Sequence, residues 1–203
     1  THVLTDKTGT LTEGNPRVTA IVPAKGFNDQ ALLTLAGSLE QSSEHPLARA
    51  VVDHVKEKGI FLKGIQNFET IPGGGVKGIL DGRHLFLGKR KYIEEISGQL
   101  PEDLIHRSAE LEEKAQTVVW IAEEKNIRGL LGISDPIKKT TPEAIQALHQ
   151  MGLKVIMLTG DNRKTAQAIA KELKIDEVRA ELEPRDKQAI VKEYKKKGAV
   201  VLM

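Results

Sequence analysis

The chain has no cysteine among its 203 residues, so disulfides and thiolate metal sites are excluded. Aromatic residues make up only 3%, so aliphatic side chains must fill any core. Neither sign of charge dominates: 30 basic against 28 acidic residues give a net charge of +2, without the concentrated basic surface typical of nucleic-acid binding. No apolar run approaches the length that spans a bilayer, and no signal peptide opens the sequence. These absences predict a cytosolic globular region that does not bind nucleic acid.

The first two thirds of the chain predict helices followed by short strands in tight succession. After an opening strand, apolar periodicity predicts helices over 29–40 and from Pro46 to Gly59. The dipeptide Asp81-Gly82 is a strong signal for a tight hairpin, and consecutive strands joined by tight turns imply an antiparallel sheet. The other elements expected here are strands at 17–22, 68–71, 75–80, 84–87, 117–122 and 127–133, and a helix over 102–114.

The last third alternates between helices and strands, which predicts a parallel sheet wrapped by helices. The opening strand, residues 1–5, belongs naturally in that sheet. The fold class is therefore α/β: an incomplete doubly wound domain formed by 1–18 and 134–203, interrupted by an α+β domain over 19–133 with an antiparallel sheet. The elements expected in the last third are helices at 142–151, 164–173 and 184–197 and strands at 153–158, 178–181 and 199–203.

The heptad from Asp6 to Thr12 (Asp-Lys-Thr-Gly-Thr-Leu-Thr) carries the most specific chemistry. It places a carboxylate at the end of a buried strand, followed by hydroxyl groups and a glycine whose backbone N–H groups can face a phosphoryl group. Such a carboxylate can act as a nucleophile and form an acyl-phosphate. The alternative is an ordinary turn before a threonine-rich strand.

This heptad resembles the phosphorylation motif of P-type ATPases, within the haloacid dehalogenase superfamily. The resemblance implies that Asp6 accepts the γ-phosphoryl group of ATP, and that Thr8 offers its hydroxyl to the phosphate and its carbonyl to Mg²⁺. Asp6 and Thr8 are thus the expected magnesium ligands, with a further aspartate in a loop beyond Met203. Phosphatases of the superfamily usually carry a second aspartate where Thr8 stands, so its absence favours a long-lived aspartyl-phosphate.

Three further segments match the catalytic parts of that family. Thr159 and Gly160 follow a predicted parallel strand, where a hydroxyl and N–H groups could hold phosphate, although a simple helix cap is the alternative. Lys187, in the segment Pro-Arg-Asp-Lys, matches the lysine that neutralises charge at the phosphoryl group. Asp135 matches an aspartate that braces the phosphorylated loop, which is compatible with a β-turn through the following proline.

The string Ser-Glu-His-Pro-Leu at 43–47 resembles the signature of heavy-metal P-type ATPases. The resemblance implies that His45 contacts the adenine end of ATP and that Glu40 meets the adenine amino group. Gly73 and Gly75 match a Gly-x-Gly that lets adenosine approach the backbone, although a glycine run by itself is a weak signal. Lys89 stands where the family often has asparagine.

The resemblance predicts the ATP-binding and phosphorylation region of a heavy-metal pump, copper or silver more than zinc, with ATP and Mg²⁺ as cofactors. The expected partners are the membrane and actuator domains of the same polypeptide, on the cytoplasmic face of a membrane, with the region itself soluble and monomeric. Two alternatives remain: a soluble phosphatase with an inserted cap, and a nonenzymatic nucleotide-binding fragment.

Overall fold

The computed structural model describes residues 2–196, 198 and 200–201, and its chain divides into two compact units. The first unit consists of Thr1–Asn15, Glu112–Thr117 and Asp135–Met203, and the second of Pro16–Leu111 and Val118–Ser134. As domain boundaries, the expected divisions at 18/19 and 133/134 stay a prediction. No helix in the described ranges is both long and apolar enough to cross a membrane.

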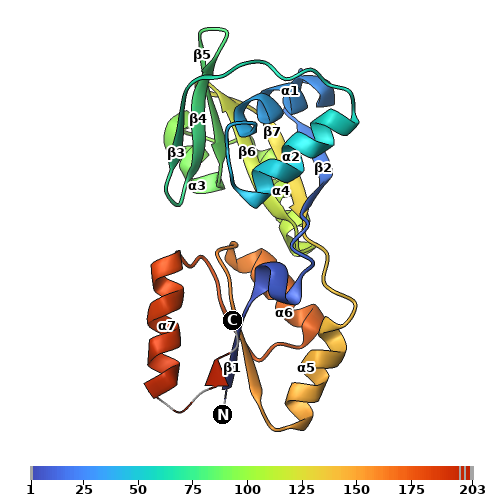
Figure 1. The fold of residues 1–203 in the computed structure, drawn as a ribbon. Helices are drawn as coiled ribbons and strands as arrows, with labels where there is room; N and C mark the ends of the chain where they lie inside the picture. The colour runs from blue at the N-terminus through green and yellow to red at the C-terminus, as the bar shows by residue number, and fades with distance from the viewer. Residues whose placement is uncertain (1, 197, 199, 202–203) are drawn as a thin grey trace. The chain divides into compact units, whose positions relative to one another are not determined.

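The first unit is built on a parallel sheet with the strand order β10-β1-β8-β9 (Figure 1). Asp6 pairs with Leu158, which pairs with Arg179, so the carboxyl ends of three strands meet at one edge. The helices α5 and α6 cover one face of the sheet and α7 covers the other. The elements are β1 (His2–Asp6), α5 (Thr141–Gln150), β8 (Lys154–Leu158), α6 (Arg163–Leu173), β9 (Glu177–Arg179), α7 (Pro184–Lys196) and β10 (Val200–Val201).

The alternation of side chains along β8 gives this sheet two cores. Val155 and Met157 pack with Ile169 of α6, whereas Ile156 and Leu158 pack towards the α7 side. These four side chains are buried, as expected for a strand covered on both faces. The parallel sheet between helices confirms the predicted fold class for this part of the chain.

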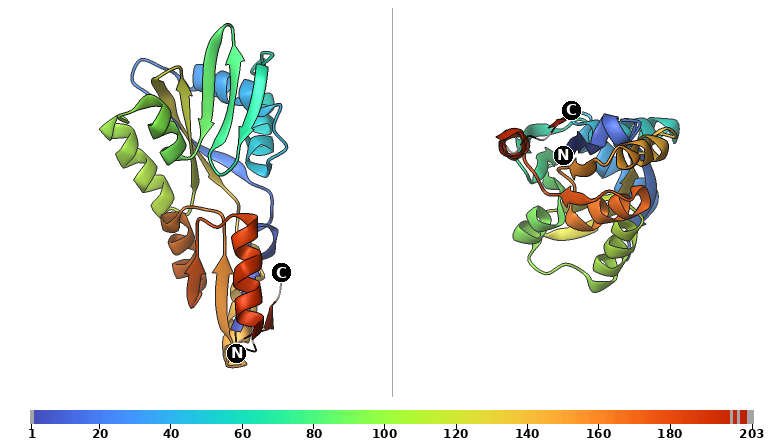
Figure 2. Two further views of the ribbon diagram at one scale, coloured as in Figure 1. Left: turned by 90° about the vertical axis from the view of Figure 1, so that its left-hand side faces the viewer. Right: turned by 90° about the horizontal axis from the view of Figure 1, so that it is seen from below.

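The second unit contains an antiparallel sheet with the strand order β2-β7-β6-β5-β4-β3. The helices α1 and α2 pack on one face and α3 and α4 on the other (Figures 1 and 2). The hairpin turn between β4 and β5 has φ of 49° at Asp81 and 78° at Gly82, the left-handed pair that an Asp-Gly turn favours. The elements are β2 (Arg17–Pro23), α1 (Asp29–Glu40), α2 (Pro46–Glu57), β3 (Gln66–Ile71), β4 (Gly75–Leu80), β5 (Arg83–Gly88), α3 (Arg90–Ser97), α4 (Glu102–Glu113), β6 (Thr117–Glu123) and β7 (Asn126–Ser134). The end of α4 from Glu112 and the first residue of β6, Thr117, fall in the first unit.

Two expectations need correction. Helix α3 was not predicted, because it has only eight residues and begins after Lys89, which makes no side-chain capping bond. The strand expected at 178–181 is instead β9, which ends before Glu181, a residue with a left-handed φ of 59°. Residues 197, 199, 202 and 203, which the predicted final helix and strand include, lie outside the described residues.

Candidate functional site

The loop that follows Asp6 is a tight turn. Thr8 (φ −72°, ψ 124°) and Gly9 (φ 76°, ψ −13°) have the dihedrals of the two central residues of a type II turn, which requires glycine at the second. The Thr12 N–H donates to the Lys7 carbonyl at 3.2 Å and closes the loop. Thr8 and Thr10 remain exposed. The heptad therefore forms a compact loop that presents hydroxyl groups beside the carboxylate of Asp6.

Asp6 is held from two sides at the end of β1. Its Oδ1 accepts a hydrogen bond from the Lys187 ammonium at 2.8 Å and another from the Lys7 N–H at 2.8 Å. The Asp6 side chain is 39% exposed and that of Lys187 28%, so the pair is accessible to solvent. The structure thus brings two residues 181 positions apart into direct contact and places a cation against the candidate nucleophile.

Thr159 lies just past the end of β8, next to the strand that ends in Asp6. It is 2% exposed, and its hydroxyl donates to Asp161 Oδ2 at 2.9 Å while accepting from the Asp161 N–H at 3.2 Å. A Cβ at Gly160 would lie 3.2 Å from the Leu182 carbonyl oxygen, so this turn is tight. Within the described part of the chain, no hydrogen bond joins Thr159 to Asp6; its hydroxyl is used inside its own turn.

A buried ion pair between Lys7 and Asp161 was not predicted from the sequence. The Lys7 ammonium lies 2.5 Å from Asp161 Oδ2, and the two side chains are only 7% and 13% exposed. Asp161 Oδ1 also accepts from the Thr117 hydroxyl at 3.1 Å. The sequence showed Asp161 only as part of a capping turn, and nothing in the spacing of 154 residues links it to Lys7. The pair ties the heptad to the turn after β8.

Asp135 lies beside the heptad. One of its carboxylate oxygens accepts from the buried Thr12 hydroxyl at 2.5 Å and the other from the Asn15 N–H at 3.1 Å. Thr12 Oγ1 in turn accepts from the Gly9 N–H at 3.2 Å, and Lys138 donates to the Gly9 carbonyl at 2.7 Å. A chain of hydrogen bonds therefore runs from Asp135 through Thr12 to the glycine of the turn.

Among the described residues, two of the predicted magnesium ligands are Asp6 and the carbonyl of Thr8. No group of three or more carboxylate or imidazole side chains that could hold a metal occurs in the described ranges. Mg²⁺ typically takes one or two carboxylates and completes its shell with phosphate and water. Asp6 and the carbonyl of Thr8 fit that minimal role, because Asp6 is accessible and Thr8 is exposed.

The predicted adenine-contacting residues flank the loop between α1 and α2. His45 is the N-cap of α2: it is exposed, and its Nδ1 accepts from the Leu47 N–H at 3.2 Å. Glu40 ends α1 and is 6% exposed, with no hydrogen-bond partner for Oε2 in the described structure. Burial raises the pKa of Glu40 to about 7, against an opposing hydrogen bond with Ser43.

Of the predicted glycines, Gly73 lies in the turn between β3 and β4, and Gly75 is the first residue of β4. Gly73 has a left-handed φ of 71°, and a Cβ at Gly75 would lie 2.0 Å from the Leu87 carbonyl oxygen. The close approach of β4 to β5 therefore leaves no room for a side chain at position 75, and this packing explains the glycine whether or not a ligand binds nearby. Lys89 precedes α3, and its N–H donates to the Gly74 carbonyl at 2.9 Å.

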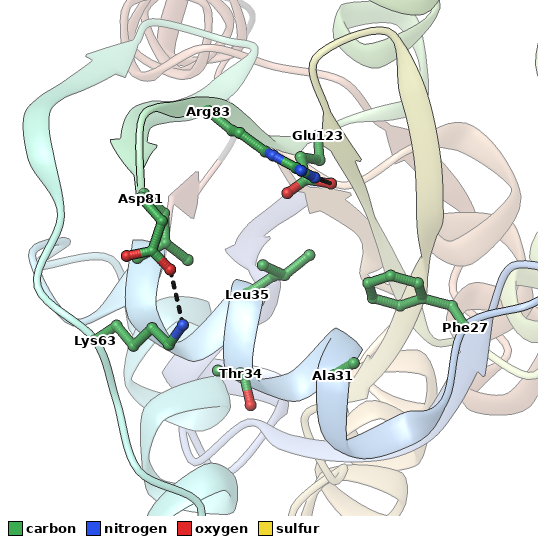
Figure 3. A pocket seen from close by; sticks show the side chains of 9 residues that line it. Phe27, Ala31, Thr34, Leu35, Lys63, Asp81, Arg83 and Glu123 are labelled. Atoms are coloured by element: carbon green, nitrogen blue, oxygen red, sulfur yellow. Dashed lines mark hydrogen bonds and ion pairs between the residues drawn. The ribbon is translucent and has the colours of Figure 1, made fainter.

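Two hollows of the second unit lie apart from these residues. The larger, about 440 Å³, is formed by Phe27, the exposed side of α1 and the β4–β5 turn, where Lys63 pairs with Asp81 at 2.8 Å (Figure 3). The smaller, about 350 Å³, lies on β3, β4 and β5 beside His84 and Phe86. Neither is lined by Glu40, His45, Gly73 or Gly75.

Comparisons with known proteins identify close relatives. The whole chain, residues 1–203, matches the family model of haloacid dehalogenase-like hydrolases. It is 44% identical over 201 residues to a copper-transporting P-type ATPase of Rhizobium leguminosarum bv. viciae, covering 99% of this chain and 24% of that protein. It is 39% identical to a silver exporting P-type ATPase of Salmonella typhimurium, again with coverages of 99% and 24%. The chain thus spans about a quarter of the length of these curated relatives.

Solved structures agree with the sequence relatives. One solved structure is the catalytic domain of the CPx-ATPase CopB-B, from a study of its conformational changes upon nucleotide binding. It superposes on this chain with a TM-score of 0.74 at 28% identity, and the match covers 100% of this chain and 69% of that one. A zinc-transporting PIB-type ATPase in its E2.Pi state gives a TM-score of 0.65 at 34% identity, covering 99% of this chain and 32% of that one. These likenesses confirm the resemblance that the heptad and the Ser-Glu-His-Pro-Leu string predicted.

Proposed function

Since the chain belongs to the haloacid dehalogenase-like hydrolase family, we propose that it is the ATP-binding and phosphorylation region of a heavy-metal-transporting P-type ATPase. In this proposal a carboxylate oxygen of Asp6 attacks the γ-phosphorus of ATP. A new P–O bond forms as the bond to the β-phosphate oxygen breaks, and the electron pair of that bond leaves with ADP. The relatives that transport copper or silver support copper or silver as the ion class.

The observation that carries the proposal is the contact between Asp6 and Lys187 at 2.8 Å, at the carboxyl edge of a parallel sheet. Phosphoryl transfer depends mainly on positioning and on neutralising charge around the phosphoryl oxygens. Lys187 can do both, since its ammonium already touches the nucleophile and remains partly exposed to an incoming phosphate. The buried ammonium of Lys7 is directed to Asp161 instead.

The loop after Asp6 supports a pump over a phosphatase. Thr8 stands two residues after Asp6 and is exposed, and it offers a hydroxyl where a hydrolytic enzyme of this superfamily would have a carboxylate to activate water. Without that base the aspartyl-phosphate would persist. Mg²⁺, held by Asp6, the Thr8 carbonyl and an aspartate beyond Met203, would neutralise the phosphate oxygens. Asp135 would keep the turn rigid through Thr12.

Within the proposal, the second unit holds the nucleotide. Glu40 and His45 flank one loop and would contact the adenine, with Gly73 and Gly75 near the sugar. The rest of the polypeptide would supply the membrane and actuator domains, on the cytoplasmic face of a membrane. The alternative is a fragment that binds nucleotide but is not phosphorylated. It is kept because the chain spans only 24% of the length of the copper-transporting relative.

A titration with a non-hydrolysable ATP analogue tests the nucleotide half. His45→Ala should weaken binding at least tenfold, because stacking and hydrogen bonding to the purine are lost. Asp6→Asn should bind as tightly as the parent, and His106→Ala, on the exposed side of α4, is the matched histidine control. Equal affinities for the parent and the His45 variant would remove the nucleotide assignment.

A further inference from the structure

The carboxylate of Asp161, in the turn after β8, contacts three groups of the first unit. Its Oδ1 accepts from the Thr117 hydroxyl at 3.1 Å. Its Oδ2 accepts from the Thr159 hydroxyl at 2.9 Å and lies 2.5 Å from the Lys7 ammonium. Since the Asp161 side chain is only 13% exposed, these groups replace most of its hydration, and losing one of them is costly.

The Thr159 hydroxyl has one proton, and it donates that proton to Asp161. The same oxygen accepts from the Asp161 N–H at 3.2 Å, and Thr159 is buried, so the hydroxyl is satisfied within its own turn. Thr159 is predicted to bind a phosphoryl oxygen, which in its ionised form can only accept hydrogen bonds. When a phosphoryl group reaches the site, the hydroxyl must therefore turn its proton from the carboxylate to the phosphoryl group.

The cost of this exchange depends on the partners that Asp161 retains. Once Thr159 has turned away, Lys7 still contacts Oδ2 and Thr117 still donates to Oδ1. Without the Thr117 hydroxyl, Oδ1 would have no donor among the described residues. Releasing Thr159 would then leave a nearly buried carboxylate with Lys7 as its one side-chain partner, and the penalty for that unsatisfied oxygen would oppose the exchange.

Thr117 is held in place independently of the carboxylate that it contacts. The residue before it, Gln116, accepts at its carbonyl from the buried Thr165 hydroxyl at 2.8 Å. Earlier in the same segment, the Glu112 carboxylate accepts from the Asn162 amide at 3.2 Å. These segments all belong to the first unit, and Asn162 also caps α6 through the Thr165 N–H. The Thr117 hydroxyl is therefore presented at a fixed position.

We propose that Thr117 is a positioning residue for phosphoryl transfer: by holding Asp161, it lets the Thr159 hydroxyl turn from the carboxylate to the phosphoryl group. The inference rests on the proposed function. The exchange moves one hydrogen bond, and no covalent bond forms or breaks in it. Thr117 acts through Asp161 and needs no contact with ATP or with the nucleophile. Because the exchange occurs only when a phosphoryl group arrives, its effect belongs to the rate and not to nucleotide binding.

The test compares phosphorylation rates in the full-length protein, which carries the chain past Met203. Thr117→Val keeps the branched shape of the side chain and removes its donor. In a single turnover with saturating γ-labelled ATP and Mg²⁺, the rate of adduct formation should fall about tenfold or more, the order expected for a hydrogen bond to a charged group. The affinity for a non-hydrolysable ATP analogue should stay within about twofold, because only an interaction of the transition state is weakened.

Two variants separate positioning from folding. Thr117→Ser restores the hydroxyl and should keep the rate within about threefold of the parent. Thr165→Val also removes a buried hydroxyl from this segment contact, but one that does not touch Asp161, so it should lose comparable stability in urea unfolding and keep most of the rate. Equal slowing by Thr117→Val and Thr165→Val, or no rescue by serine, would show a structural role alone and overturn the inference.

A double variant tests whether Thr117 acts through the Thr159 hydroxyl. Thr159→Ala removes the group that has to be released, so adding Thr117→Val to it should slow the reaction by less than about twofold further. If Thr117→Val slows the Thr159→Ala protein as much as it slows the parent, the hydroxyl exchange is not the reason, and the inference is wrong.

A structure of the full-length protein with Mg²⁺ and beryllium fluoride, which mimics a phosphoryl group on an aspartate, does not depend on the folding of any variant. We expect the Thr159 hydroxyl to lie at hydrogen-bond distance from a fluoride and no longer from Asp161, while Thr117 stays on Oδ1. Thr159 still bonded to Asp161 would overturn the inference, and so would a parent adduct that Thr117→Val forms equally fast; in both cases the proposed function stands. If the parent forms no adduct on Asp6 and binds no beryllium fluoride there, the proposed function itself is wrong.

Discussion

The buried pair of Lys7 and Asp161 offers the sharpest energetic test of the structure. Both side chains are nearly inaccessible, and their charged atoms lie 2.5 Å apart. Removing one partner of a buried ion pair leaves the other charge uncompensated and typically costs about 3–5 kcal/mol. In Lys7→Met, Asp161 would keep the hydroxyl groups of Thr117 and Thr159, so we expect a loss at the lower end, about 3 kcal/mol.

Asp161→Leu should be worse, at about 4–5 kcal/mol, because it leaves a buried ammonium and deprives both threonine hydroxyls of their acceptor. The double variant should lose clearly less than the sum, by about 1–3 kcal/mol, since neither charge is then left alone. The exposed pair of Arg107 and Glu110 is the matched control, and Arg107→Ala should change stability by less than about 0.5 kcal/mol.

Urea unfolding gives the free energies, and hydrogen exchange of the β1 and β8 amides locates the loss in the first unit. Exchange is needed because Trp120, the only tryptophan, belongs to the second unit and reports on that unit alone. With slopes of about 1–3 kcal/mol per molar urea, a loss of 3 kcal/mol lowers the midpoint by at least about 1 M. A Lys7→Met variant within about 1 kcal/mol of the parent, with additive double-variant energies, would show that Lys7 and Asp161 do not form a stabilising buried pair.

Three further predictions concern packing, pH and the loop. Gly75→Ala should cost about 1–3 kcal/mol or more in urea unfolding, since its Cβ would meet the facing strand, whereas Gly64→Ala, with open space around it, should be neutral. Hydrogen bonds from the Val155 N–H and from the imidazole of His149 lower the pKa of Asp176 below its ordinary 3.8. The ionised carboxylate therefore stabilises the folded state fully above pH 3.8, and this stabilisation is lost as the pH falls through the lower, folded-state pKa. The thermal unfolding temperature of Asp176→Asn should accordingly depend less on pH in that acid range than the temperature of the parent. Asp135→Ala should speed amide exchange of residues 7–12 selectively, and unchanged exchange there would contradict its bracing contacts.

Local signals in the sequence predicted most elements. Helix α1 has the predicted bounds, because leucines repeat along one face and Asn28, at its N-cap, accepts from the Ala31 N–H. Strand β4 also has its predicted bounds, which the glycines before it and the Asp-Gly turn after it define. Helix α3 escaped prediction because its short, charged sequence carries no comparable signal, and it forms where Ile93 can be buried.

The site was predictable where a motif carries its own chemistry. Asp6, Thr8 and Lys187 came from short strings, and the structure places Lys187 against Asp6; their roles stay predictions. The partner of Lys7 was not predictable, because it depends on the pairing of β1 with β8. That pairing joins distant parts of the chain and has no short-range sequence signal. The protonation of Glu40 likewise depends on its burial, which the sequence does not display.

The most direct test of the central claim is the transfer of label from γ-labelled ATP to a chain extended past Met203, in the presence of Mg²⁺. We expect an adduct that is stable in acid, is released by hydroxylamine and is absent from Asp6→Asn, with Lys187→Ala forming it much more slowly. Label that persists in the Asp6→Asn chain would show that the phosphoryl group is transferred to another residue and that Asp6 is not the nucleophile.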